Sequence, residues 1–108
     1  SAKGTSDRIF ALIEARLSDP DLRTGMIAAE LGISLRTVQN AFAALATTPS
    51  AYIQQRRLEL AAERLAAGSS ERITEIAYEI GFNDSAYFTR CFRQQYGKSP
   101  SEWRARAS

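Results

Sequence analysis

The sequence predicts an all-α fold, and three observations predict it. Apolar residues recur with the 3.6-residue period of a helix along most of the chain. Strand signals are nearly absent, because there is no sustained two-residue alternation and no Asn-Gly or Asp-Gly hairpin turn. Capping residues and glycines stand where helices are expected to begin and end. The 108 residues, 44% apolar and 24% charged, suffice for one compact globular domain or two very small ones.

The first helix is expected to begin at Ser6, which would act as its N-cap. Residues 1–6 are interpreted as a disordered lead-in or a remnant of cloning. The helix should end before Pro20, because the residue that precedes a proline is biased away from helical geometry.

A short second helix, around residues 27–31, is expected to stop at Gly32, and Thr24 is a candidate for its N-cap. Ser34 is then the N-cap of a third helix. Four apolar residues of this third helix are expected to face inward: Leu35, Val38, Phe42 and Leu45.

A long fourth helix is predicted from Thr48 as N-cap, with a proline at its first position, to about Ala67. A short helix after residue 72 stops at Gly81, and Asn83 or Asp84 caps the next one. Gly97 ends that helix, and "SPSEW" (99–103) contains a capping box for a last helix.

The chain contains an internal repeat of a helix, a glycine-containing turn and a second helix. "IAAELGIS" (27–34) aligns with "IAYEIGFN" (76–83). In each copy the glycine stands where a left-handed conformation is expected, and an alanine four residues earlier allows two helices to cross closely. This is the helix-turn-helix pattern, and the fourth helix must join the two copies.

The second helix of each copy places polar side chains opposite its apolar anchors. Arg, Asn and Gln read guanine and adenine edges in the major groove, and Ser and Thr read either. The candidates for base reading are Arg36, Thr37, Gln39 and Asn40 in the first copy, and Ser85, Ala86, Thr89 and Arg90 in the second.

Positive charge gathers in residues 31–58 and 85–108, whereas residues 7–30 and 59–84 are acidic. Two separate basic segments suggest two contacts with one polyanion. The residues expected to contact DNA phosphates are Ser34, Arg56, Arg57, Arg93 and Lys98.

Other functional classes find little support in the sequence. With no histidine, one cysteine and no glycine-rich phosphate loop, we expect no enzyme, no cofactor and no metal site. Cys91 is expected to be a buried thiol. No apolar run is long enough to span a membrane, and a cytoplasmic, nucleoid-associated location fits. A helical protein–protein interaction module remains the alternative to a DNA-binding domain.

The segment "ITEIAYEIGFNDSAYFTRCFRQQYGKSPSEWR" (73–104) resembles the signature of the AraC/XylS-type transcription regulators. "IAAELGISLRTVQNAF" and "PSAYIQQRRLELAAERL" are similar to the upstream half of the same family. The family usually has a glycine at the end of the third helix, whereas "ALATTP" here has none and is one residue shorter.

The resemblance implies seven helices in two helix-turn-helix subdomains, at 7–47 and 69–108, joined by a linking helix at 48–68. It implies sequence-specific binding to double-stranded DNA, with two recognition helices in adjacent major grooves, and regulation of transcription. Family members commonly carry an effector-sensing domain before this one, and activators contact RNA polymerase. We therefore expect that the chain is either a standalone regulator or a C-terminal domain excised from a longer protein, and we favour the second interpretation.

Overall fold

The computed structural model describes residues 2–107, and every regular element among them is a helix. The all-α prediction is therefore confirmed over these residues. The seven helices are α1 (Ala2–Ala15), α2 (Thr24–Leu31), α3 (Leu35–Ala43), α4 (Pro49–Ala66), α5 (Ile73–Glu79), α6 (Ser85–Tyr96) and α7 (Pro100–Ala107).

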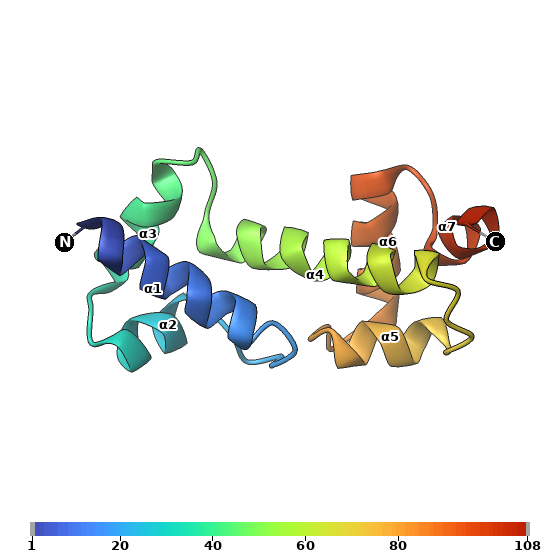
Figure 1. The fold of residues 1–108 in the computed structure, drawn as a ribbon, viewed down its shortest axis with the longest axis horizontal. Coiled ribbons are helices and arrows are strands. Elements are labelled where there is room, and N and C mark those ends of the chain that lie inside the picture. The colour runs from blue at the N-terminus through green and yellow to red at the C-terminus, as the bar shows by residue number, and fades with distance from the viewer. Residues whose placement is uncertain (1, 108) are drawn as a thin grey trace.

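The molecule is elongated, with extents of 45 × 23 × 21 Å. The long helix α4 runs through its middle, with α1, α2 and α3 around one end and α5, α6 and α7 around the other (Figure 1). An 18-residue helix is about 27 Å long. Helix α4 therefore separates the two groups of helices while it packs against both.

Each end of the molecule has its own hydrophobic core. In the first, the ring of Phe42 is fully buried, and its centroid lies 5.0 Å from that of Phe10 and 5.3 Å from that of Tyr52. The remaining buried residues of this core come from α1 to α4 and from the segment between α1 and α2: Ile9, Ile13, Leu17, Leu22, Ile27, Ala28, Val38 and Ile53.

In the second core, the ring of Phe92 is fully buried between aromatic neighbours. Its centroid lies 5.8 Å from that of Phe88, 4.8 Å from that of Tyr96 and 5.9 Å from that of Trp103. The indole Nε1 of Trp103 also donates a hydrogen bond of 3.1 Å to the carbonyl oxygen of Ala62 on α4. The last helix is thus fastened to the linking helix.

The two helix-turn-helix turns have the same hydrogen-bonding pattern. The amide of Ile33 donates to the carbonyl oxygen of Ala28, and the amide of Phe82 donates to that of Ala77, both at 3.0 Å. Gly32 has φ 64° and Gly81 has φ 105°, so both lie in the region that favours glycine. The repeat read from the sequence is therefore a repeat of backbone geometry.

The side-chain caps predicted for four helices are present. Ser34 Oγ accepts from the amide of Thr37, and Thr48 Oγ1 accepts from the amide of Ala51. Of the two candidates before α6, Asp84 is the cap, because its Oδ1 accepts from two amides of the first turn. The capping box before α7 also forms, in the region 99–102.

The expectation for residues 1–6 is wrong where the structure describes them. Helix α1 begins at Ala2, so Ser6 lies inside the helix and is not its N-cap. The reason is tertiary. Thr5 and Ser6 are half-buried and line a shallow hollow together with Asn40 of α3, which extends the packing of α1 toward the N-terminus. The first residue of the chain lies outside the described residues.

Three other local expectations need correction. Thr24 is the first residue of α2 and not its cap, since Arg23 occupies the cap position without a side-chain hydrogen bond. Leu35 and Leu45 do not face inward, with exposed fractions of 52% and 58%. Leu35 is the first residue of α3, and Leu45 lies beyond its last turn, so neither follows the buried stripe of the helix.

Helix α3 ends in a Schellman turn that has alanine in place of glycine. The amide of Thr47 donates to the carbonyl of Phe42, the amide of Ala46 donates to that of Ala43, and Ala46 has φ 57°. A left-handed conformation costs a residue with a Cβ about 1–2 kcal/mol. The turn thus forms without the glycine that the family usually has there.

Ala46→Gly is therefore expected to stabilise the protein by about 0.5–1 kcal/mol. The substitution removes the strain of the left-handed alanine, and the greater conformational entropy of glycine in the unfolded chain offsets part of this gain. Urea denaturation followed by circular dichroism measures the change. The control is Ala44→Gly, two residues away at φ −63°, which should destabilise instead. A loss of stability in Ala46→Gly would contradict the assigned strain.

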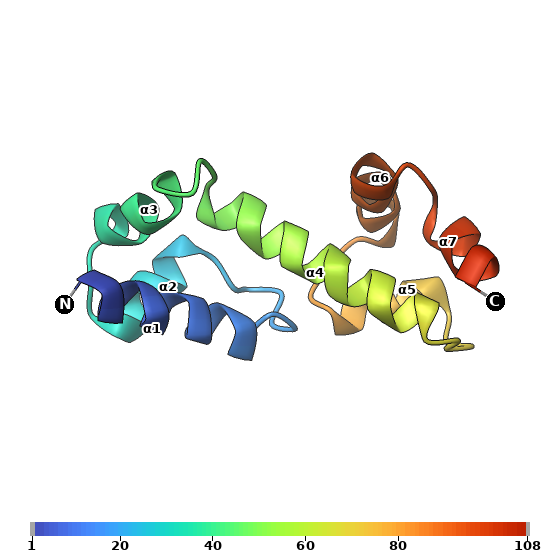
Figure 2. The same cartoon turned by 45° about the horizontal axis from the view of Figure 1, so that its top comes forward.

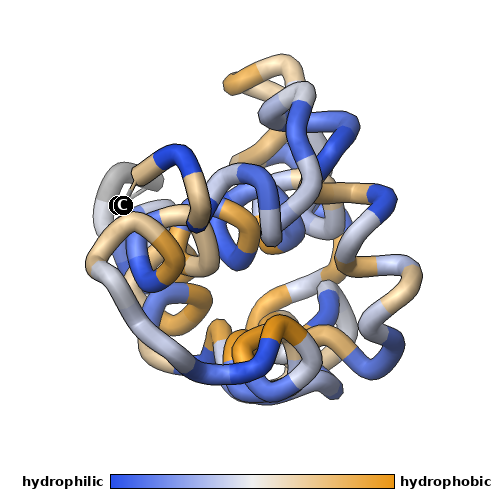
Figure 3. The backbone as a smooth tube through the Cα atoms, turned by 90° about the vertical axis from the view of Figure 1, so that its right-hand side faces the viewer, coloured by the Kyte–Doolittle hydropathy of each residue, from blue (hydrophilic) through white to orange (hydrophobic). Residues whose placement is uncertain are grey.

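Within residues 2–107, no helix combines the length and the apolar character that a bilayer span requires. Hydrophilic and hydrophobic stretches are interspersed along the chain in the view down the long axis (Figure 3).

Candidate nucleic-acid interface

The second helices of the two helix-turn-helix units, α3 and α6, lie on the same side of α4. In Figure 1 the upper turns of α3 and α6 stand above α4, and in Figure 2 α6 lies above it and α3 beside its first turns, whereas α1, α2 and α5 lie below it or level with it. A flat or gently curved partner could therefore meet both helices at once, with α4 setting their separation.

The outer face of α3 is polar and exposed. Its base-reading candidates Arg36, Gln39 and Asn40 are all exposed, whereas Val38 and Phe42 on the inner side of the helix are fully buried. Among the described residues, none forms an ion pair with Arg36. The guanidinium therefore needs no internal contact broken before it can meet a ligand.

The start of α3 is held in shape by its own side chains. Ser34 Oγ lies 2.9 Å from the hydroxyl oxygen of Thr37 and 3.1 Å from its amide nitrogen. Both residues remain exposed. Two of the predicted contact residues thus also fix the geometry of the helix terminus, where free amides favour an anion.

The outer face of α6 is less polar. Ala86 and Arg90 are exposed, while Ser85 and Thr89 are half-buried. The hydroxyl of Thr89 donates to the carbonyl oxygen of Ser85 at 3.0 Å, so its proton is already used. The second helix therefore offers one strong hydrogen-bonding side chain, Arg90, beside the methyl group of Ala86.

Tyr87 belongs to this surface, although the sequence analysis did not single it out as a binding residue. Its ring is 44% exposed, and the guanidinium carbon of Arg90 lies 5.6 Å from the ring centroid, a cation–π distance. Its hydroxyl donates a hydrogen bond of 3.0 Å to Gln54 Oε1 on α4. The spacing of three residues between Tyr87 and Arg90 on a helix was the available signal.

Arg56, a predicted phosphate contact, has internal partners for its guanidinium. It binds Glu14 of α1 through two nitrogens, at 2.8 and 2.9 Å, and Glu59 of α4 at 2.6 Å. The hydrogen bond from Arg56 lowers the pKa of the Glu14 carboxyl, and both carboxylates raise the pKa of Arg56. Arg56 thus joins α1 to α4.

Arg57, another predicted phosphate contact, also has internal partners. It is half-buried, with Nε donating to the carbonyl oxygen of Leu17 at 2.8 Å and Nη2 donating to that of Asp19 at 2.7 Å. Burial lowers the pKa of this guanidinium. Arg57 therefore donates hydrogen bonds to two backbone carbonyl oxygens just after α1 ends.

The remaining predicted phosphate contacts stand at or beyond the end of α6. Arg93 is exposed and Lys98 is half-buried. Both lie near Glu102, whose pKa is lowered first by its hydrogen bonds with Ser99 and further by these two positive charges. Cys91, on the inner side of α6, is buried, as predicted.

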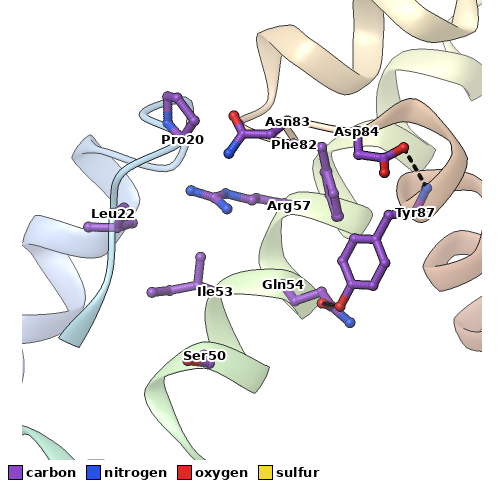
Figure 4. A pocket seen from close by; sticks show the side chains of 11 residues that line it. Pro20, Leu22, Ser50, Ile53, Gln54, Arg57, Phe82, Asn83, Asp84 and Tyr87 are labelled. Carbon is purple, nitrogen blue, oxygen red and sulfur yellow. Dashed lines mark hydrogen bonds between the residues drawn. The ribbon is translucent and has the colours of Figure 1, made fainter.

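An open hollow of about 260 Å³ is lined by residues from both ends of the molecule. Pro20 and Leu22 line it on one side, and Phe82, Asn83 and Tyr87 on the other, with the side chain of Arg57 between them (Figure 4). The floor consists of residues of α4.

Comparisons with known proteins agree with this geometry. The family described as "Helix-turn-helix domain" matches residues 27–106. The transcriptional activator NphR of a Rhodococcus species is 39% identical over 90% of this chain, which covers 29% of that protein. RhrA, a transcriptional activator of Rhizobium meliloti, is 39% identical over 89% of this chain, which covers 31% of it. The chain thus spans less than a third of the length of these relatives.

Solved structures show the same fold. A regulator from Chromobacterium violaceum, described as having an AraC-type DNA-binding domain, superposes with a TM-score of 0.88 and 29% identity, over 98% of this chain and 94% of that one. The DNA-binding domain of AdpA, solved in complex with a target DNA, superposes with a TM-score of 0.81 and 27% identity, over 94% and 90%.

Proposed function

The chain belongs to the AraC/XylS-type family of helix-turn-helix regulators, and from this premise we propose that it binds double-stranded DNA at a specific sequence and thereby regulates transcription. The observation that carries the proposal is the pair of like turns that place α3 and α6 on one side of α4. Their outer faces carry exposed arginine and amide side chains over buried aromatic anchors.

In this proposal α3 and α6 enter successive major grooves, which lie roughly 34 Å apart along one face of the duplex. Arg36 would donate two hydrogen bonds to a guanine, and Gln39 and Asn40 suit adenine. In the second groove Arg90 is the main reader, oriented by the ring of Tyr87, and Ala86 suits the methyl group of thymine. Helix α3 thus carries more of the sequence specificity than α6.

Phosphate contacts would come from Ser34 at the start of α3 and from Arg93 and Lys98 at the far end of the molecule. Such contacts position a protein without reading bases. Arg56 and Arg57 take no part, because their guanidinium groups hold α1.

Salt dependence tests the proposal as a whole. Affinity for a duplex selected from a random library should fall steeply between 50 and 200 mM salt, because bound cations are released on binding. Arg93→Ala should weaken binding about equally on all sequences and reduce the salt slope by about 1. Fluorescence anisotropy measures both. Binding that does not respond to salt would favour a protein–protein interaction module instead.

Base reading has its own test. Arg36→Ala and Arg90→Ala should each cost about 1–3 kcal/mol on the selected site and relax sequence preference at one position. Arg72→Ala is the matched control, since Arg72 is 84% exposed at its side chain and lies before α5, away from both reading faces. If both reading variants kept the sequence preference of the parent, the assignment would be wrong.

Partners beyond DNA are proposed from the relatives alone. Since NphR and RhrA are named as activators, we propose that this domain works next to RNA polymerase when it activates a promoter. An effector would act through a part of the protein outside these 108 residues, and the location would be the cytoplasm, on the chromosome.

A further inference from the structure

The two ends of the molecule also meet away from the axis of α4. The turn between α5 and α6, at Gly81, approaches Leu17, just beyond the end of α1, and the side chain of Arg57 lies next to both. The chemistry of this contact is unlike that of a surface salt bridge, because it joins an arginine to backbone.

The glycine is packed tightly on both partners. A Cβ built on Gly81 would lie 2.5 Å from the carbonyl oxygen of Leu17, 2.6 Å from Nε of Arg57 and 2.8 Å from its Cζ. Real Cβ atoms do not approach other atoms so closely. The backbone of the second helix-turn-helix unit therefore touches both a carbonyl of the first unit and the guanidinium that binds it.

The guanidinium itself is held in a fixed orientation. Its Nε donates to the carbonyl oxygen of Leu17 at 2.8 Å, and its Nη2 donates to the carbonyl oxygen of Asp19 at 2.7 Å. Both acceptors lie in the segment that follows α1. A planar guanidinium that donates along two directions cannot rotate without losing a hydrogen bond. Figure 4 shows it between Pro20 on one side and Phe82 and Asn83 on the other.

This second contact matters because a single helix is a weak restraint on orientation. Helices of this length bend gently, and a bend or a repacking along α4 would change the angle between α3 and α6. A contact away from the axis of α4 opposes such motion. The contact requires that the charged guanidinium of Arg57 be partly buried, which is unfavourable. The hydrogen bonds to two carbonyl oxygens offset this cost.

We propose that Arg57 is a positioning residue that locks the end of α1 against the α5–α6 turn and thereby sets the distance and angle between α3 and α6. Its consequence for DNA rests on the proposed function: the lock makes the protein selective for the spacing between the two parts of its site. One base pair changes that spacing by about 3.4 Å and also rotates one part relative to the other.

The first arm of the test needs no DNA. Spin labels are placed on cysteines introduced at exposed Ala43 of α3 and exposed Gln94 of α6, in a Cys91→Ala background, and their distance distribution is measured by double electron–electron resonance. The parent should give one narrow distribution. Arg57→Met, which keeps the apolar stem, should widen it about twofold or more.

Arg56→Met is the matched control, because the neighbouring arginine donates its hydrogen bonds to Glu14 and Glu59 and not to the segment after α1 that Arg57 binds. It should leave the distribution narrow. If Arg57→Met fails to fold by circular dichroism, Arg57→Lys takes its place, since a lysine keeps the charge but lacks the planar fork. A distribution as narrow as that of the parent in the folded Arg57 variant overturns the proposal.

The second arm measures binding to duplexes in which one base pair is inserted or deleted between the two contacted parts. The parent should lose about tenfold or more in affinity for each altered spacing, and the Arg57 variant about threefold or less. Equal losses in parent and variant overturn the proposal. If the parent binds no duplex, the proposed function fails, and the distance distributions still decide whether Arg57 is a lock.

Discussion

Phe92→Ala is expected to lower the free energy of unfolding of the second half of the molecule by about 3–5 kcal/mol. Its ring is fully buried among Phe88, Tyr96 and Trp103, which come from α6 and α7 and cannot collapse together into the space it leaves. Most of the stability of a small domain would be lost. Helices α5, α6 and α7 should then unfold locally.

Because the two cores are separate, this unfolding should be confined to one end. Native-state hydrogen exchange should show loss of amide protection in α5, α6 and α7, with protection retained in α1, α2 and α3. Phe42→Ala, at the corresponding position of the first repeat, is the matched variant and should give the opposite pattern. Uniform loss of protection in both variants would mean that α4 couples the cores into one cooperative unit.

Gly81→Ala is expected to cost roughly 3 kcal/mol or more, whereas Gly32→Ala should cost about 1–2 kcal/mol. The two glycines occupy equivalent turns, but only Gly81 has backbone and guanidinium atoms within 3 Å of the place that a Cβ would take. At Gly32 the space is open, and the cost is the left-handed conformation alone.

Guanidinium chloride denaturation of both variants measures this difference directly. The Gly81 variant should also broaden the distance distribution between α3 and α6, since relief of the clash moves the turn away from Leu17. Equal costs at the two glycines would show that the turn can yield without strain, and would weaken the case for a tight contact between the two ends.

The sequence predicted the elements of the second half better than the start of the first. Local signals suffice for α6, because Asp84 caps it, Gly97 ends it and Phe88 and Phe92 mark its inner side. The start of α1 depends on packing against α3, which no capping rule expresses. Leu35 shows the same limit. It is apolar, but it is the first residue of α3, and its side chain is exposed because the helix reaches the core only further along.

The exposure of candidate residues could be predicted where it follows from helix periodicity, as for Arg36, Asn40 and Arg90. The internal partners of Arg56 and Arg57 could not be predicted. Two adjacent arginines on a linking helix have the same local pattern whether they meet phosphate, carboxylates or backbone carbonyls. Apart from Glu59, their partners lie about forty positions earlier in the chain, and only the fold brings them together.

The position of Trp103 has a practical consequence. It is the only tryptophan of the chain, it packs on Phe92 and Tyr96, and its indole nitrogen is bonded to α4. Fluorescence excited at the red edge of protein absorption therefore arises from the second half of the molecule alone. The protein carries a built-in optical probe for one of its two helix-turn-helix units, and the other unit contributes no tryptophan emission at that wavelength.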